Sequence, residues 1–118
     1  MKLYYMETMN PRKVCATAKY LRSPIEYIPI DRVPGGLKGA EYMAINPNGR
    51  APVLVDGELK LWESAAIMMH LAIQAKDDLW PLSDPARQVE IVRCGSVTQS
   101  WSTFSDGDDH ASRNGEKQ

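Results

Sequence analysis

Near the start of the chain, the pattern of apolar and polar residues is first typical of a strand, then of a helix, and then of a second strand. Residues 2–6 form a short apolar and aromatic run, typical of a strand. Between residues 11 and 22 the apolar side chains recur at helical spacing, with Asn10 as the expected N-cap and Pro11 at the first helical position. Residues 25–30 are rich in β-branched and aromatic side chains, and Pro29 favours an edge strand. This βαβ order predicts two parallel strands.

The second half of the pattern predicts a hairpin that runs into a helix. After a loop at residues 33–39 and a short helix at residues 40–45, residues 52–61 give two strands around Asp56-Gly57, a pair typical of a type I′ turn. A long helix is expected to follow directly from Glu63-Ser64. The order βαβ, loop, ββα predicts an α/β, thioredoxin-like domain with a mixed four-stranded sheet.

The remaining residues predict two smaller segments after this domain. Residues 77–82 are expected to form a linker that packs Leu79 and Trp80 back onto the domain, and a helix is expected from Pro85 to Phe104. Residues 105–118 contain one alanine and no other apolar side chain, which is typical of a disordered tail. The predicted organisation is therefore residues 1–82, 83–104 and 105–118.

Composition and charge exclude several classes of function. The 118 residues suit one compact domain, and 43% apolar residues are enough for a core. A net charge of -1 gives no broad electrostatic footprint for a nucleic acid or an anionic membrane. No apolar run approaches the ~20 residues that span a bilayer, and Glu7 comes too early for a signal peptide. Neither the cysteines nor the histidines have metal-site spacing (Cys15, Cys94, His70, His110). We expect a cytoplasmic protein without a metal.

Four segments in order resemble one known family. These are the opening strand, the helix start at residues 10–14, the turn Asn46-Pro47-Asn48-Gly49-Arg50-Ala51-Pro52-Val53-Leu54, and the helix start Glu63-Ser64. Residues 1–82 resemble the N-terminal domain of soluble glutathione S-transferases, most closely the bacterial theta, beta and nu forms. The resemblance implies the thioredoxin-like fold, glutathione as substrate, conjugation of its thiolate to small electrophiles, and a homodimer. The family's second domain is all-helical and supplies most of the electrophile pocket. Only its first helix is expected here, so that domain is incomplete.

The resemblance and the residue chemistry together suggest how glutathione would be held. Ser64 at a helix start offers a hydroxyl and backbone N–H groups to the γ-glutamyl carboxylate, and Glu63 can accept from the ammonium group. The alternative is that both residues only cap the helix. Arg50 suits the glycine carboxylate, although an exposed arginine in a turn is more often a solvated charge. Pro52 matches the family's cis-proline, with a trans proline as the alternative, and Ala51 would pair its backbone with the cysteinyl part.

The residue that activates the thiol follows from the resemblance. In the resembling classes a hydroxyl or thiol lies in the loop after the first strand, and Thr8 falls at that place. Asn10 is the alternative donor, unless it is occupied as the N-cap. Cys15 lies on the apolar stripe of the helix and is expected to be a buried packing residue, and His70 a surface or packing residue. Two other functions remain open: a non-catalytic glutathione-binding or interaction module, and an inactive truncated fragment.

Overall fold

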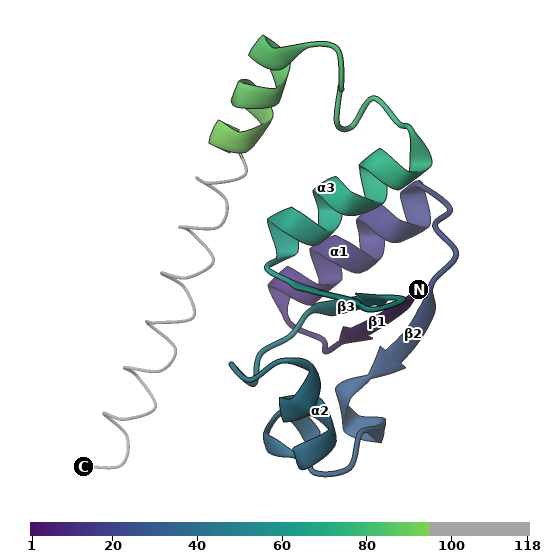
Figure 1. The fold of residues 1–118 in the computed structure, drawn as a ribbon, viewed down its shortest axis with the longest axis vertical. Coiled ribbons are helices and arrows are strands. Elements are labelled where there is room, and N and C mark those ends of the chain that lie inside the picture. The colour runs from purple at the N-terminus through teal and green to yellow at the C-terminus, as the bar shows by residue number, and fades with distance from the viewer. Residues whose placement is uncertain (95–118) are drawn as a thin grey trace, which may run out of the picture. The chain divides into compact units, whose positions relative to one another are not determined.

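A four-stranded mixed sheet forms the centre of the first part of the molecule (Figure 1). The computed structural model describes residues 1–94. The strands are β1 (Lys2–Tyr5), β2 (Glu26–Pro29), β3 (Val53–Asp56) and β4 (Leu59–Trp62), in the order β2-β1-β3-β4. β1 and β2 are parallel, whereas β3 is antiparallel to both β1 and β4. The predicted fold class is confirmed, and Pro29 lies on an edge strand, where its missing N–H is tolerated.

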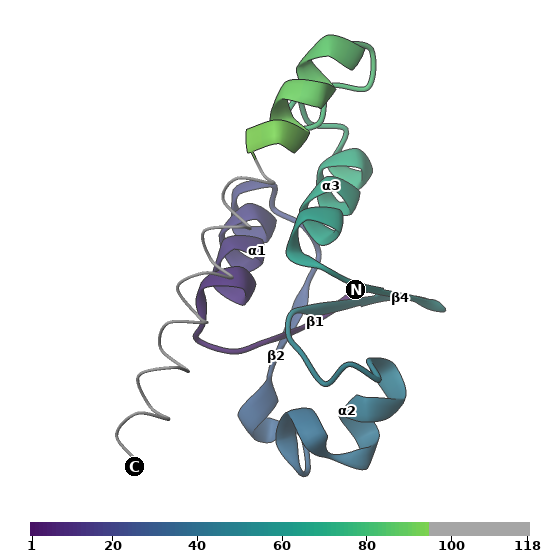
Figure 2. The same ribbon diagram turned by 90° about the vertical axis from the view of Figure 1, so that its left-hand side faces the viewer.

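Helices cover both faces of this sheet (Figure 2). Helices α1 (Met9–Tyr20) and α3 (Ser64–Ala75) lie side by side on one face, and α2 (Ala40–Ile45) lies on the other. Two short 3-10 turns, Ile30–Arg32 and Gly36–Lys38, connect β2 to α2. This is the thioredoxin-like arrangement that the order of elements predicts.

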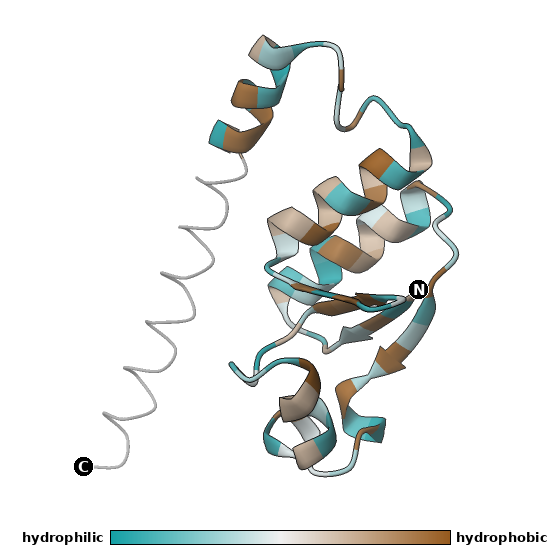
Figure 3. Cartoon of the chain, in the orientation of Figure 1, coloured by the Kyte–Doolittle hydropathy of each residue, from teal (hydrophilic) through white to brown (hydrophobic). Residues whose placement is uncertain are grey.

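Two apolar cores, one on each face of the sheet, result from the alternation of side chains along the strands. Figure 3 shows apolar residues, in brown, on the strands and on the helices. Leu3 and Leu54 face α1 and α3, whereas the neighbouring Val53 faces α2. The first core comprises buried residues of the sheet and the two long helices (Leu3, Val14, Ala18, Leu54, Ile67, Leu71). The second comprises buried residues of the other face (Ile30, Val33, Tyr42, Val53). The sheet is thus fixed from both sides.

The start of α1 differs from the prediction. Thr8, not Asn10, is the N-cap residue, with extended φ and ψ of -107° and 171°, and its carbonyl accepts from Arg12 N at 3.1 Å. Asn10 is inside the helix and Pro11 is its third residue. Because the first four N–H groups of a helix have no partner within it, Pro11 costs no hydrogen bond there. Pro11 is buried, so its ring packs while its backbone loses nothing.

The hairpin turn is also displaced by one residue from its predicted place. Asp56 pairs with Leu59 in the sheet, so the two turn residues are Gly57 and Glu58 rather than Asp56 and Gly57. Only Gly57 has a positive φ, at 61°. A glycine first and an ordinary residue second is the pattern of a type II′ turn, not of the predicted type I′ turn, in which both residues need positive φ.

The described residues divide into two compact units, the first from Met1 to Trp80 and the second from Pro81 onward. In the second unit, residues 85–94 are helical. The rest of the helix predicted to end at Phe104, and the predicted tail at residues 105–118, lie outside the described residues. No helix within residues 1–94 is long and apolar enough to cross a membrane.

Candidate functional site

The sheet register brings the predicted site residues to one edge. Tyr4 of β1 pairs with Val53 of β3, and Val53 pairs with Trp62 of β4. Just past this row of paired residues, β1 leads to Thr8 and β4 leads to residues 63–64. Residues 50–52 lie at the same end, because they directly precede β3. Because adjacent strands lie about 5 Å apart, these three segments converge at the same end of the sheet.

The turn at residues 50–52 is held by two side chains that sequence reasoning did not assign to the site. The Arg50 carbonyl accepts hydrogen bonds from the Tyr42 hydroxyl and, at 2.9 Å, from Asn46 Nδ2. Asn46 Oδ1 in turn accepts from Asn48 N at 3.1 Å. The next peptide bond, Ala51–Pro52, is cis. Asn46 and Tyr42 are both buried, so this network fixes the path of the chain just before Ala51.

Tyr42 is a neutral donor within this network. Burial raises the pKa of its phenol to about 12, an effect that the nearby Tyr4 increases and the hydrogen bond with Asn46 opposes. Its ring meets the ring of Tyr4 edge-on, with centroids 5.7 Å apart. The phenol therefore keeps its proton at neutral pH and donates a hydrogen bond to the Arg50 carbonyl. The asparagine was visible in the sequence as part of the turn, but nothing there pointed to Tyr42.

Glu63 and Ser64 form the start of α3. Glu63 is the N-cap residue and has φ of 74°, a value that residues other than glycine seldom adopt and that costs about 1–3 kcal/mol. Ser64 is the first helical residue and is 2% exposed. Within the described part of the chain its Oγ has no hydrogen-bond partner. A buried hydroxyl and the unpaired N–H groups of a helix start together make a site that accepts a carboxylate.

Thr8 and Asn10 lie in different surroundings at the start of α1. Thr8 is exposed, its side chain makes no cap hydrogen bond, and it lines a cavity of about 290 Å³ between the ends of β1 and β2. Asn10 is half-buried, and Oδ1 is a buried atom without a partner in residues 1–94. The hydroxyl of Thr8 is therefore available as a donor, whereas the buried atom of Asn10 is an acceptor.

The remaining candidates are an exposed arginine and a histidine with a structural contact. Arg50 is exposed at the turn, which agrees with the alternative that it is a solvated surface charge. His70 of α3 bonds to Asp56 of β3 through Nε2 and Oδ2 at 3.1 Å, which ties the helix to the hairpin. In residues 1–94, no group of three or more His, Cys, Asp or Glu side chains could hold a metal ion.

Comparison with known protein families shows which family the chain belongs to. Residues 1–73, more than half of the chain, match the family model described as "Glutathione S-transferase, N-terminal domain". The chain belongs to the glutathione S-transferase family. Two individual members of the family are also similar to this chain. It is 43% identical over 84 residues to glutathione S-transferase GstB of Escherichia coli (strain K12), an alignment that covers 69% of this chain and 40% of that protein. A glutathione S-transferase of Silene vulgaris is 53% identical over 47 residues, which cover 40% of this chain and 22% of that protein.

Solved structures of glutathione transferases share this fold. The theta class enzyme of Xanthomonas axonopodis pv. citri, solved with glutathione bound, is 35% identical with a TM-score of 0.67, and the match covers 75% of this chain and 42% of that one. Human glutathione transferase theta-2, solved in complex with glutathione, is 32% identical with the same TM-score, over 75% of this chain and 37% of that one. In each comparison the chain spans less than half the length of its relative.

Proposed function

We propose that this chain binds glutathione at the sheet edge formed by Ser64, Glu63 and the turn at residues 50–52. One observation carries the proposal: the Ser64 hydroxyl is buried at the start of a twelve-residue helix, and no residue of the described chain bonds to it. A buried polar group without a partner costs about 1–3 kcal/mol. The γ-glutamyl carboxylate would supply that partner, and the helix dipole would favour its charge.

The other contacts follow from the chemistry of the tripeptide. Glu63 would accept from the γ-glutamyl ammonium group. Ala51, directly after the carbonyl that Tyr42 and Asn46 hold, would pair its backbone with the cysteinyl part of the ligand as one strand pairs with another. Arg50, exposed beside it, would meet the glycine carboxylate with its guanidinium fork. Relatives of this fold have been solved with glutathione bound, which supports the assignment.

Replacement of Ser64 by Ala tests the binding site. Losing a hydrogen bond to a charged group costs about 1.5–3 kcal/mol, so the dissociation constant of glutathione should rise roughly 10- to 100-fold. Isothermal titration calorimetry on the intact chain measures it. Ser83→Ala is the control, because Ser83 is an exposed serine outside the site. Equal affinity of the two variants would place glutathione elsewhere.

We further propose that Thr8 activates the glutathione thiol, which then attacks a small electrophile. A thiolate is stabilised by a donor, and one pKa unit of stabilisation needs about 1.4 kcal/mol. In the complex, the thiolate absorbance in the ultraviolet should titrate at a pKa below that of free glutathione. Thr8→Val should raise this pKa by about one unit, within the ~0.5–1.5 kcal/mol of one hydrogen bond, while Thr8→Ser preserves it.

The same titration separates the alternatives. If Asn10→Ala abolishes the shift and Thr8→Val does not, Asn10 is the donor. If glutathione binds to the intact chain with an unchanged thiol pKa, the chain is a binding module without transferase chemistry. If glutathione does not bind at all, the fragment without function is the correct description.

A further inference from the structure

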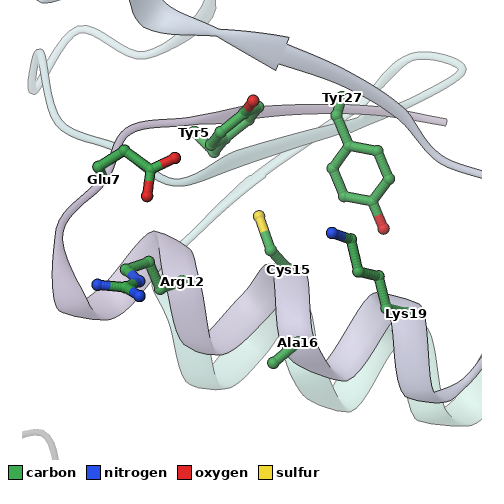
Figure 4. Close-up of a pocket in the computed structure, with 7 residues that line it drawn as sticks. All are labelled: Tyr5, Glu7, Arg12, Cys15, Ala16, Lys19 and Tyr27. Atoms are coloured by element: carbon green, nitrogen blue, oxygen red, sulfur yellow. The ribbon is translucent and has the colours of Figure 1, made fainter.

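A second cavity lies between α1 and strands β1 and β2 (Figure 4). Its volume is about 550 Å³, within the range of roughly 300–1,000 Å³ that small-molecule sites occupy. Tyr5 of β1 and Tyr27 of β2 form one side, and α1 contributes the other. None of the residues proposed to bind glutathione or to activate its thiol lines it. It adjoins the smaller cavity that Thr8 lines, since Tyr5 and Glu7 border both, but it is a candidate site distinct from the proposed glutathione contacts.

The two tyrosine rings give this cavity an aromatic corner. Leu3 pairs with Tyr27 and Tyr5 pairs with Pro29, so the two tyrosines are diagonal neighbours on the sheet face that α1 covers. Their ring centroids are 6.3 Å apart and their planes stand at 85°. A flat ring can stack on one of these rings while its face meets the edge of the other, which is the geometry that aromatic groups prefer. The corner thus suits a planar aromatic group.

The helical side of the cavity is cationic. Arg12 and Lys19 are seven residues apart, two turns along the same side of α1, with Cys15 and Ala16 between them. Lys19 Nζ lies 5.7 Å from the centroid of the Tyr27 ring, within the range of a cation–π contact. Among residues 1–94, Glu7 is the single acidic residue that lines the cavity. Two cations against one carboxylate favour an anionic ligand, and the fork of Arg12 matches a carboxylate.

Cys15 lies at the centre of this lining and points toward the tyrosines (Figure 4). The prediction of a packing residue holds in part: Cys15 packs against the first core, but it is half-buried and borders the cavity. Burial raises the pKa of its thiol, with Lys19 opposing and Glu7 adding to the shift. A thiol that keeps its proton is a poor nucleophile, so Cys15 acts as a soft, weakly polar surface for a ligand.

We propose that the cavity between α1 and strands β1 and β2 binds a planar aromatic carboxylate. Its ring occupies the corner of Tyr5 and Tyr27, and its carboxylate meets Arg12 and Lys19. A neutral aromatic molecule would give the two cations no anionic partner, and an aliphatic acid would not stack in the tyrosine corner. The position of Cys15 provides a direct readout, because a ligand in the cavity covers its sulfur atom.

The test follows the reaction of Cys15 with N-ethylmaleimide at a fixed, mildly alkaline pH. The intact chain carries Cys94→Ser, so that Cys15 is its single thiol. Naphthalene-2-carboxylate is compared with naphthalene-2-carboxamide, which lacks the charge, and with cyclohexanecarboxylate, which lacks the flat ring. The aromatic acid should slow the reaction in a saturable way, at concentrations where the other two have little effect. Equal protection by the acid and the amide, or no protection by any of them, would overturn the proposal.

Variants then test whether the charges do what the geometry implies. Arg12 and Lys19 are exposed, so changing them leaves the core intact. Arg12→Gln combined with Lys19→Gln should raise the protecting concentration of the acid roughly tenfold, because both exposed ion pairs to the carboxylate are lost. Lys13→Gln is the matched control on the same helix, because Lys13 does not line the cavity. If the double variant and the control behave alike, the carboxylate is not held there. Ser64→Ala should leave the protection unchanged, which keeps this result independent of glutathione binding.

Discussion

At the scale of single residues, the path of the chain at the proposed site depends on a tyrosine that is not one of the proposed ligand contacts. Tyr42 donates to the carbonyl of Arg50 from a fully buried position, next to Asn46. The carbonyl would otherwise be left with a single partner in an environment with little access to water. The residue that would bind the peptide is therefore positioned by a side chain of α2, on the other face of the sheet.

The titration of Tyr42 should appear in the pH dependence of stability. Its pKa rises from an ordinary value near 10 to about 12, so the folded state holds the proton more tightly than the unfolded state. The resulting stabilisation is complete below pH 10 and is lost as the pH rises from 10 through 12. At pH 11, one unit above the ordinary pKa, the loss should be on the order of 1 kcal/mol.

Urea unfolding of the intact protein and of Tyr42→Phe at pH 9 and pH 11 measures this loss. The variant starts less stable by about 0.5–1.5 kcal/mol because one hydrogen bond is missing, but it should lose less stability between the two pH values. Tyr27, whose pKa burial also raises, is present in both proteins, so its contribution cancels. Parallel losses in the two proteins would show that Tyr42 is not the group responsible.

Individual residues also show what sequence reasoning can reach. Ser64, Glu63, Ala51 and Pro52 could be predicted as ligand contacts from the resemblance, because each belongs to a short segment with a fixed spacing. The hydrogen bond from Tyr42 joins residues eight apart across an irregular loop, and no periodicity predicts such a contact. The same limit applies to the pair His70 and Asp56, which lie fourteen residues apart.

At the scale of elements, helix and strand periods were enough to predict the order and type of the strands and long helices in residues 1–94, but not their ends. Asn10 and Pro11 formed a plausible helix start, yet the buried ring of Pro11 packs inside the first turn and moves the start back to Met9. The turn at Gly57 moved by one residue because the pairing of Asp56 with Leu59 sets the register. In both places tertiary packing selected between local patterns of similar quality.

Two glycines allow the turn before the site to be tested against a matched control. Gly49 and Gly57 have φ of 60° and 61°. A Cβ on Gly49 would lie 3.0 Å from Lys38 Nζ and 3.2 Å from both the Leu37 carbonyl oxygen and Met43 Sδ, whereas a Cβ on Gly57 meets nothing within 4 Å. Gly57→Ala should therefore cost only the backbone strain of a positive φ, about 1–3 kcal/mol. Gly49→Ala should cost this strain and, in addition, about 1–3 kcal/mol of overpacking.

The same pair of variants should separate stability from binding. Gly49 immediately precedes Arg50, and its N–H bonds to the Asn46 carbonyl at 3.0 Å. A shift there displaces Ala51, so glutathione affinity should fall in Gly49→Ala. It should stay unchanged in Gly57→Ala, since Gly57 lies at the opposite end of β3. Thermal unfolding and calorimetry give the two quantities, and a loss of affinity in both variants would show that general destabilisation is the cause.

At the scale of the whole molecule, the buried apolar residues and the proposed site share one unit. Apart from Pro81, the buried apolar side chains of the described chain lie between Leu3 and Ala72, and the first compact unit ends at Trp80. The proposed glutathione residues, from Thr8 to Ser64, lie in the same unit. The chain corresponds to less than half of its relatives' length, and the part that it shares with them is the part that carries this edge of the sheet.

A chain shortened to residues 1–82 should therefore unfold cooperatively and bind glutathione with the affinity of the full chain. Both cores remain complete in it, and no proposed contact is removed. A second chain that ends at His70 is the control, because it lacks Leu71, which is 0% exposed, and the last turn of α3. The loss of one buried leucine alone costs about 2–5 kcal/mol, so this shorter chain should have no cooperative transition. Circular dichroism during heating, followed by calorimetry, distinguishes the two. If the chain of residues 1–82 loses either property, residues after 82 contribute to the fold or the site, and the boundary that we propose for this domain is wrong.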